Sequence, residues 1–483
     1  MLFNSIDFAI FLPIVFGLYW FVFNHNLKLQ NLLIVVASYL FYGWWDWRFL
    51  SLILFSTLVD YSVGIVISNT KNSGKRKWWL WISIIVNLGF LGFFKYYNFF
   101  LDNFIDAFSL LGYEFRASSL NIILPVGISF YTFQTMSYTI DVYRKKLEPT
   151  KDFIAFSAFV SFFPQLVAGP IERATNLLPQ FYSKRVFEYH KAVDGLRQIL
   201  WGLFKKVVIA DNCAEYANLI FNNYQDYSGS TLLLGAFFFT FQIYGDFSGY
   251  SDIAIGTSRL FGFNLMQNFA FPYFSRDIAE FWRRWHISLS TWFRDYLYIP
   301  LGGSQGSQWM RVRNTFIIFL VSGFWHGANW TFIVWGALNA IYFLPLLLTN
   351  KNRKNLDVVA QEKLFPSLKT ILSIIGTFFL TIFAWIFFRA ENISHALTYI
   401  YNMFNSNLLT IPSHNFLKDI AYLILLLVFF IIVEWYGRTN LYAIEKTALR
   451  KNRTIRWGFY AFIIFLIGMY MQTEENPFIY FQF

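Results

Sequence analysis

Six histidines occur in the chain, and one of them lies deep inside an apolar segment. His326, in VSGFWHGANWTF, is preceded by about a dozen largely apolar residues and followed by more. A side chain that can take up or release a proton is costly to bury at that depth, so His326 indicates a functional site. The alternative is a structural histidine that hydrogen-bonds between helices.

A second histidine, His286, stands in a segment that mixes arginines with aromatic residues, FWRRWHISLSTWFRDYLYIP. Tryptophan, tyrosine and arginine together are typical of an amphipathic helix at a membrane surface. The alternative is a polar funnel that contains His286. Two histidines forty residues apart, without acidic residues at ligand spacing, make no zinc signature, so we predict no metal site.

Two carboxylates, Asp246 and Asp252, lie six residues apart in YGDFSGYSDIAIG. Paired carboxylates can do acid and base work. More often such residues pair with a nearby lysine or arginine, or cap a helix, and we favour that structural role. The same role is favoured for Asp60 and for the adjacent lysines Lys205 and Lys206.

The chain ends on an aromatic segment, PFIYFQF, which carries Phe478, Tyr480, Phe481 and Phe483. An exposed apolar patch usually marks a contact site or an aggregation liability, so we expect the tail to be held by something. The aromatic belt at the membrane surface is one candidate. A cavity of the same protein is the other.

The elements that must position these residues are membrane helices. Hydrophobic residues make up 56% of the 483 residues and charged residues only 14%, whereas soluble chains carry about 25% charged residues. Apolar runs near the roughly 18 to 20 residues needed to cross a bilayer recur along the chain. They predict an all-α polytopic membrane protein with about 11 to 12 spans and additional re-entrant or interfacial helices. The twelve runs are 7–23, 30–46, 48–68, 78–100, 120–141, 153–170, 195–212, 230–262, 314–348, 370–388, 418–436 and 456–471.

The distribution of charged residues and of apolar runs gives further information on partners, topology and domains. The net charge of +11 comes from residues in loops between apolar runs, not from one basic patch interleaved with aromatics, so we expect no nucleic-acid partner. Basic loops belong in the cytoplasm, and counting spans from them places both termini, including the tail 473–483, outside it. Without an internal repeat or a low-complexity linker, we expect residues 1–483 to form a single domain.

In 171–313, charges, glycines and prolines interrupt the apolar runs, which indicates irregular backbone along a cavity.

Four segments together resemble the membrane-bound O-acyltransferase family, in the branch that contains the membrane subunit of alginate O-acetylation. They are SFFPQLVAGPIER, YGDFSGYSDIAIGTSRLFGF, AEFWRRWHISLSTWFRDYLYIPLGG and GFWHGANWTFIVWGALN. The resemblance implies a helical ring around a thinned centre, with the catalytic core at about 120–348. A cytoplasmic tunnel is expected to meet an outer funnel there at the catalytic histidine. His326 matches that residue, and His286 matches the second histidine or asparagine of the family pattern.

The resemblance also implies a role for the tail. Related members that D-alanylate lipoteichoic acid work with a small peptide ending in FxYxxF, a pattern that Phe478, Tyr480 and Phe483 reproduce here. The tyrosine would carry the acyl group in transit with His326 as its base, because a phenol of pKa about 10 needs one. Phe478, Phe481 and Phe483 would seat the tail. The other residues expected at the funnel are Trp325, Asp246, Asp252, Arg283 and Arg284.

By this resemblance we expect an O-acyltransferase of the cell membrane, in the first place an O-acetyltransferase subunit, with no bound cofactor. The donor would be a cytoplasmic thioester, either acetyl-CoA or an acyl carrier protein. The acceptor would be an extracytoplasmic polysaccharide, reached through a partner of the SGNH (GDSL) hydrolase type. The alternatives are a teichoic-acid D-alanyl transfer subunit, a polysaccharide or lipid transporter with His326 and Asp246 on its path, and a membrane scaffold.

Overall fold

The computed structural model describes residues 1–113, 118–405, 409–446, 452–472 and 478–479, and no strand occurs among them. These residues form helices and irregular connections, which confirms the predicted all-α class. They fall into two compact units, each described here by itself. Unit 1 comprises Met1–Ala192 with Thr257–Met266, and unit 2 comprises Val193–Gly256 with Gln267–Phe483. The single domain over 1–483 stays a prediction.

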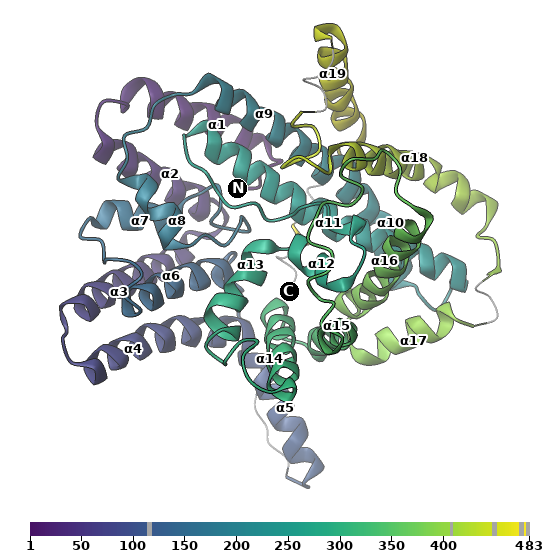
Figure 1. Ribbon diagram of the computed structural model, residues 1–483, viewed down its shortest axis with the longest axis horizontal. Coiled ribbons are helices and arrows are strands. Elements are labelled where there is room, and N and C mark those ends of the chain that lie inside the picture. Colours follow the sequence, from purple (N-terminus) through teal and green to yellow (C-terminus); the bar gives the residue numbers. More distant parts are fainter. Residues whose placement is uncertain (114–117, 406–408, 447–451, 473–477, 480–483) are drawn as a thin grey trace. The chain divides into compact units, whose positions relative to one another are not determined.

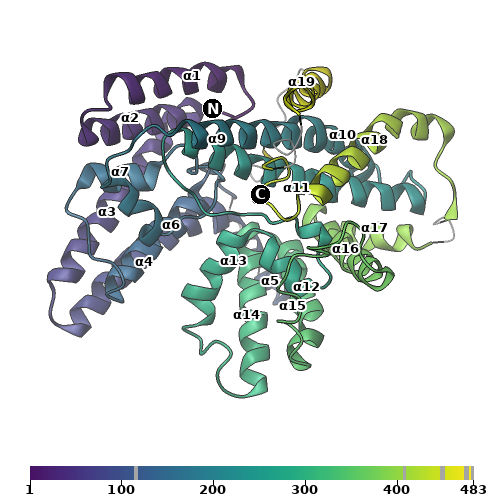
Figure 2. The same cartoon turned by 45° about the horizontal axis from the view of Figure 1, so that its top comes forward.

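Unit 1 contains the first eight helices and the start of the ninth. Figures 1 and 2 show α3 and α4 running alongside each other, with α2 next to α1. The helices are α1 (Ile6–Gly17), α2 (Leu27–Asp46), α3 (Leu50–Asn69), α4 (Ser73–Leu91), α5 (Tyr97–Leu110), α6 (Ile128–Tyr143), α7 (Phe153–Ser161), α8 (Ala174–Leu177) and α9 (Tyr189–Leu203), which continues into unit 2.

The helices of unit 1 bury several polar side chains among apolar ones and leave many apolar side chains exposed on the outside. Asp60 of α3 is fully buried and accepts hydrogen bonds from Ser83 Oγ (2.5 Å) and Asn87 Nδ2 (2.9 Å) of α4. Outward-facing rings such as Phe55 of α3 are about half exposed. This arrangement suits helices whose outer surface meets lipid, where a buried charge needs partners inside the bundle. Asp60 has the structural surroundings that the sequence favoured.

Unit 2 holds the remaining helices, among them the short α12 and α13. Its helices are α10 (Asp211–Asn222), α11 (Gly229–Leu260), α12 (Ile278–Arg284), α13 (Ile287–Phe293), α14 (Gln308–His326), α15 (Trp330–Leu348), α16 (Leu368–Arg389), α17 (Ile393–Met403), α18 (His414–Gly437) and α19 (Arg453–Tyr470). The last residues of α11 belong to unit 1. The π-helical turn η5 (Phe204–Ala210) joins α9 to α10.

Five helical stretches in the described part of the chain are long and apolar enough to cross a membrane. The chain is therefore a multi-pass membrane protein, as predicted. Other predicted spans correspond to shorter or more polar helices. The five stretches are Leu27–Asn69, Ser73–Leu110, Trp330–Leu348, Leu368–Arg389 and His414–Gly437.

Two predicted spans have different bounds in the structure. The run 120–141 becomes helical only at Ile128, because Pro125 disfavours helix before it and Gly127 adopts a left-handed φ of 77°. The run 153–170 is helical only over Phe153–Ser161. Pro164 and Pro170 follow that end, and a proline inside a helix removes a backbone hydrogen bond.

The long apolar run 314–348 is broken directly after the histidine that the sequence singled out. Helix α14 ends at His326, and α15 begins at Trp330, where the Asn329 side chain accepts a hydrogen bond from Thr331 N. The break lets α15 fold back along α14 (Figure 2). A Cβ on Gly323 would overlap the carbonyl oxygen of Phe332, so this glycine permits the close approach. The run was too long for one straight span, and the structure confirms the expected break.

Candidate active site

Glycines on α11 hold it against α9 and η5 in unit 2. A Cβ on Gly249 would lie 2.8 Å from the carbonyl oxygen of Gly202, and one on Gly256 would lie 2.5 Å from that of Gly195. Small residues at such positions let helix backbones approach closely in membrane proteins. This close packing brings the two lysines of η5 onto the face of α11 that carries Asp246 and Asp252.

Each of the two aspartates on α11 pairs with one of these lysines. Lys205 Nζ lies 2.6 Å from Asp252 Oδ2, and Gln198 Nε2 donates to the other oxygen at 2.7 Å. Lys206 Nζ lies 2.9 Å from Asp246 Oδ1 and 2.8 Å from Asp211 Oδ1. Buried carboxylates are stable only with such partners. Both aspartates thus have the lysine partners that the structural interpretation expected. Asp246 also accepts a hydrogen bond from Ile479 near the end of the chain.

His286 is held in one orientation by Asn268. The Asn268 side-chain oxygen accepts hydrogen bonds from Ser288 N (3.2 Å) and Ser288 Oγ (2.9 Å), which fixes it as the acceptor for His286 Nδ1 at 3.1 Å. His286 lies between α12 and α13, outside the five apolar stretches, and burial lowers its pKa to about 3. The neutral ring therefore carries its proton on Nδ1 and its lone pair on Nε2.

His326 occupies the end of α14 inside an aromatic cage. Its ring centroid lies 4.9 Å from that of Trp325, 5.1 Å from Trp335 on α15 and 5.3 Å from Phe388 on α16. The side chain is 2% exposed. Three helices of unit 2 thus exclude water from this imidazole, as a site that handles a water-sensitive ester would require.

The structure brings the two histidines together. Their ring centroids are 6.4 Å apart, and the Trp325 ring lies 6.0 Å from His286. Phe247 of α11 stands edge-on to His286 at 4.6 Å. At this centre His326 could take up or return a proton, and the neutral His286 could accept a hydrogen bond through Nε2. The two motifs that the sequence paired thus form one centre.

The C-terminal tail reaches the same centre. Phe478 is buried, and its ring lies 5.0 Å from that of Tyr250 and 5.9 Å from that of Phe247, the ring that abuts His286. The next residue, Ile479, is also buried, and its amide donates to Asp246 Oδ2 at 2.6 Å. The other predicted tail residues, Tyr480, Phe481 and Phe483, lie outside the described residues.

The two arginines expected at the funnel, Arg283 and Arg284, contact the loop that follows α15. Arg283 donates to the carbonyl oxygens of Asn352 (2.8 Å) and Asn355 (2.7 Å), and Arg284 donates to that of Asp357 (2.9 Å). Arg276 binds the Asp357 carboxylate at 3.0 Å and lowers its pKa. These arginines fix the course of the loop that follows α15.

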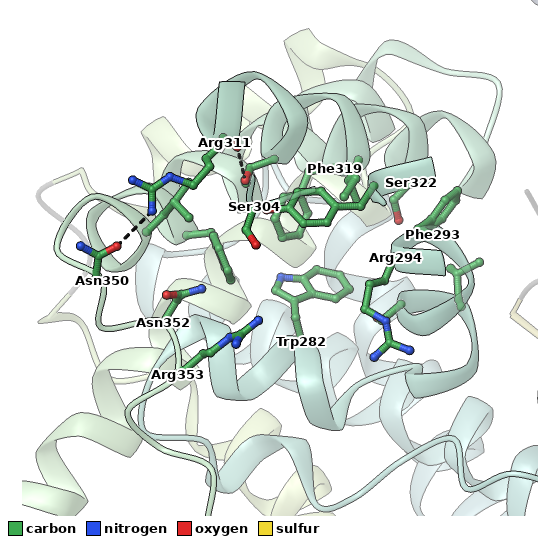
Figure 3. A pocket seen from close by; sticks show the side chains of 17 residues that line it. Trp282, Phe293, Arg294, Ser304, Arg311, Phe319, Ser322, Asn350, Asn352 and Arg353 are labelled. Atoms are coloured by element: carbon green, nitrogen blue, oxygen red, sulfur yellow. Dashed lines mark hydrogen bonds between the residues drawn. The ribbon is translucent and has the colours of Figure 1, made fainter. Parts of the chain in front are cut away.

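Next to that loop lies a cavity of about 520 Å³, which Figure 3 shows from close by. The side chains of Arg294, Arg311 and Arg353 surround the Trp282 indole. None of the described lining residues is acidic, although Arg294 also pairs with Asp295 at 2.7 Å. Guanidinium groups bind phosphate oxygens with directional, charge-assisted hydrogen bonds. The cavity can therefore accept an anionic, phosphate-bearing ligand.

The cavity and the histidine share structural elements. Ser322 of α14 lines the cavity one helical turn before His326. The Trp282 ring lies 5.6 Å from that of Trp335, which in turn contacts His326 at 5.1 Å. The Trp282 and Trp335 rings thus connect the cavity to His326.

Several residues of the site were not predicted from the sequence. Asn268, which orients His286, lies outside the four segments quoted above. Phe247, which links His286 to the tail, lies in one of them but was not singled out. Arg311 and Arg353 also line the cavity, and both lie outside the four segments that carry the family resemblance. Basic residues that flank apolar runs are usual in membrane proteins, so nothing distinguished these two.

Comparison with known proteins gives concordant matches. A family model described as MBOAT, membrane-bound O-acyltransferase family, matches residues 148–388, which include both histidines. A Pseudomonas aeruginosa protein named probable alginate O-acetylase AlgI is 42% identical over 82% of this chain and 73% of its own. The peptidoglycan O-acetyltransferase of Helicobacter pylori is 37% identical over 84% and 80%. The teichoic acid D-alanyltransferase of Bacillus subtilis is 27% identical over 57% and 71%.

Proposed function

Because the chain belongs to the membrane-bound O-acyltransferase family, we propose that it passes an acetyl group from a cytoplasmic thioester across the membrane for O-acetylation of an extracytoplasmic polysaccharide. The observation that carries this proposal is the tail: Phe478 packs on Phe247, which contacts His286 beside His326. The protein would lie in the cytoplasmic membrane with both termini outside. The donor would then reach the histidines from the cytoplasm, and the tail would reach them from the outer side of the membrane.

The transfer runs through two ester exchanges. In the first, the Tyr480 hydroxyl oxygen attacks the thioester carbonyl carbon while His326 takes the phenol proton. A carbon–oxygen bond forms, the carbon–sulfur bond breaks, and the thiolate leaves with a proton from the imidazolium. In the second, a serine hydroxyl of a partner attacks the acyl-tyrosine ester, and its proton returns to the phenolate. The neutral His286, with its lone pair on Nε2, would help to hold the reacting group in place.

The basic cavity supports a thioester donor. Acetyl-CoA and the phosphopantetheine arm of a carrier protein both join a phosphate group to a narrow pantetheine arm, which carries two amide groups and ends in sulfur. Arg353 and Arg311 would bind the phosphate, and Trp282 would line the path of the arm. No bound cofactor is needed in this scheme, because the donor itself brings the activated acyl group.

The relatives favour acetyl over D-alanyl transfer. Those named for O-acetylation are 42% and 37% identical to this chain, whereas the D-alanyltransferase is 27% identical over a shorter part of it. Alginate and peptidoglycan appear in the names of the former, and both are extracytoplasmic. An outer enzyme of the SGNH hydrolase type would complete the transfer to sugar hydroxyls.

Replacing His326 with alanine tests the proposal. Loss of the base should lower acetyl transfer from labelled acetyl-CoA by about 10²- to 10⁴-fold in membrane vesicles. His395→Gln is the matched control, since this histidine is also buried but packs on Phe221 and Tyr224. Unimpaired transfer by His326→Ala, at normal protein levels, would exclude the catalytic role. Transfer of labelled D-alanine instead of acetate would reassign the substrate.

A further inference from the structure

Asp246 divides its two carboxylate oxygens between a lysine and the tail. Oδ1 lies 2.9 Å from Lys206 Nζ, and Oδ2 accepts the Ile479 amide at 2.6 Å. Asp246 is 3% exposed, so both contacts form away from water. A hydrogen bond from a backbone amide to a buried carboxylate is among the stronger ones in proteins. The tail is therefore attached through its main chain as well as through the Phe478 ring.

The end of α19 and the residues just after it contact the chain next to this ionic group. Lys206 bridges Asp246 to Asp211. The carbonyl oxygen of Asp211 accepts a hydrogen bond from Gln472 Nε2 at 3.3 Å, and Asn212 Nδ2 donates to the Tyr470 carbonyl oxygen at 3.4 Å. The described residues on the two sides of 473–477 thus bind close to each other: Ile479 binds the Asp246 carboxylate, and Gln472 and Tyr470 bind the backbone of Asp211 and the side chain of Asn212.

Asp252 provides an internal comparison. It lies on the same helix and is paired with Lys205, and its second oxygen accepts a hydrogen bond from the Gln198 side chain. Pairing with a lysine alone therefore does not explain the position of Asp246. What distinguishes Asp246 is the amide of Ile479, the residue directly before Tyr480 in the sequence.

We propose that Asp246, held by Lys206, is the anchor of an internal tail-binding site and sets the register in which the next residue, Tyr480, is presented. Asp246 binds a main-chain N–H of the tail. It therefore fixes how far the tail enters the protein, whichever side chain residue 479 carries. A slip of one residue moves an extended chain by about 3.3 to 3.6 Å, which would carry the hydroxyl out of reach of its base. The anchor stands on the contacts alone, while its consequence for acyl transfer rests on the proposed function.

Hydrogen exchange of the Ile479 amide in the full-length protein measures the anchor directly. The amide should be protected in the wild type and should exchange roughly 10- to 150-fold faster in Asp246→Asn, which removes the charge of its acceptor. Asp252→Asn is the matched control, because it alters the neighbouring ion pair and should leave the protection in place. An Ile479 amide that exchanges at the rate of a free peptide in the wild type would overturn the proposal, whatever the activity.

A pair of tail substitutions removes the contact without touching Asp246, Lys206 or Asp211. Ile479→Pro deletes the N–H, whereas Ile479→Val keeps it in a side chain of similar size. Acetyl transfer should fall at least 10-fold in the proline variant relative to the valine variant. Equal transfer by the two would refute the role in register. A third variant, Tyr480→Phe, separates the anchor from the acyl-tyrosine relay. If it is inactive, the relay stands and only the role in register is wrong. If it is active, the relay itself is wrong.

Discussion

Substituting Gly249 with alanine should strain the packing of α11 against α9 and η5. The added Cβ would lie 2.8 Å from the Gly202 carbonyl oxygen, 3.2 Å from Lys206 N and 3.3 Å from Lys205 Cβ. Two of these three neighbours are backbone atoms, which cannot turn away as a flexible side chain can. The helices must separate by several tenths of an ångström to restore an ordinary contact. Overpacking of this kind costs about 1 to 3 kcal/mol.

The separation should also reach the ion pairs. Lys205 and Lys206 belong to the segment that Gly249 contacts, and they hold Asp252 at 2.6 Å and Asp246 at 2.9 Å. Pushing η5 away from α11 lengthens both pairs. We therefore expect Gly249→Ala to lower acetyl transfer as well as stability.

Gly468→Ala is the matched control, because a Cβ added to this helical glycine of α19 would meet no atom within 4 Å. There alanine should raise stability slightly, by about 0.5 to 1 kcal/mol, through its better helix propensity. Thermal unfolding in one detergent, followed by tryptophan fluorescence, compares the two. Gly249→Ala should lower Tm by roughly 1 to 3 °C and Gly468→Ala should not. Equal Tm values would refute the close approach of the helices.

Two further substitutions test the histidine support and the basic cavity. Asn268→Leu removes the acceptor of His286 Nδ1 and should lower acetyl transfer at least 10-fold, whereas Asn268→Asp, which keeps an acceptor oxygen, should retain more activity. Equal loss in both would argue against the orienting role. Arg353→Gln should raise the KM for the donor about 10-fold with little change in kcat, because it removes one charge-assisted contact to phosphate. An unchanged KM in steady-state assays would exclude Arg353 from the donor site.

Much of this arrangement could be predicted from the sequence. Low charge and recurring apolar runs indicated a helical membrane protein, and the length of the run 314–348 indicated a break near His326. The glycines beside that histidine supported the break, which falls directly after it. These features are local, so periodicity and composition reveal them.

The remaining features depend on contacts between distant segments. His286 hydrogen-bonds to Asn268 and has a left-handed backbone conformation with a φ of 44°. No sequence motif predicted this conformation. Asp246 and Asp252 look equivalent in the sequence, and the structure shows that Asp246 accepts the Ile479 amide while Asp252 pairs with Lys205 and Gln198. The proline-rich stretch after Ser161 read as a span by hydropathy alone, although prolines end the helix there.

The acyl-tyrosine relay is tested most directly by the intact mass of the purified protein after incubation with acetyl-CoA, followed by fragmentation of the C-terminal peptide. We predict one acetyl group on Tyr480 in the wild type, and none in Tyr480→Phe or His326→Ala. A wild-type protein that delivers acetate to the polysaccharide while Tyr480 stays unmodified, and a Tyr480→Phe variant that delivers it equally well, would contradict the relay.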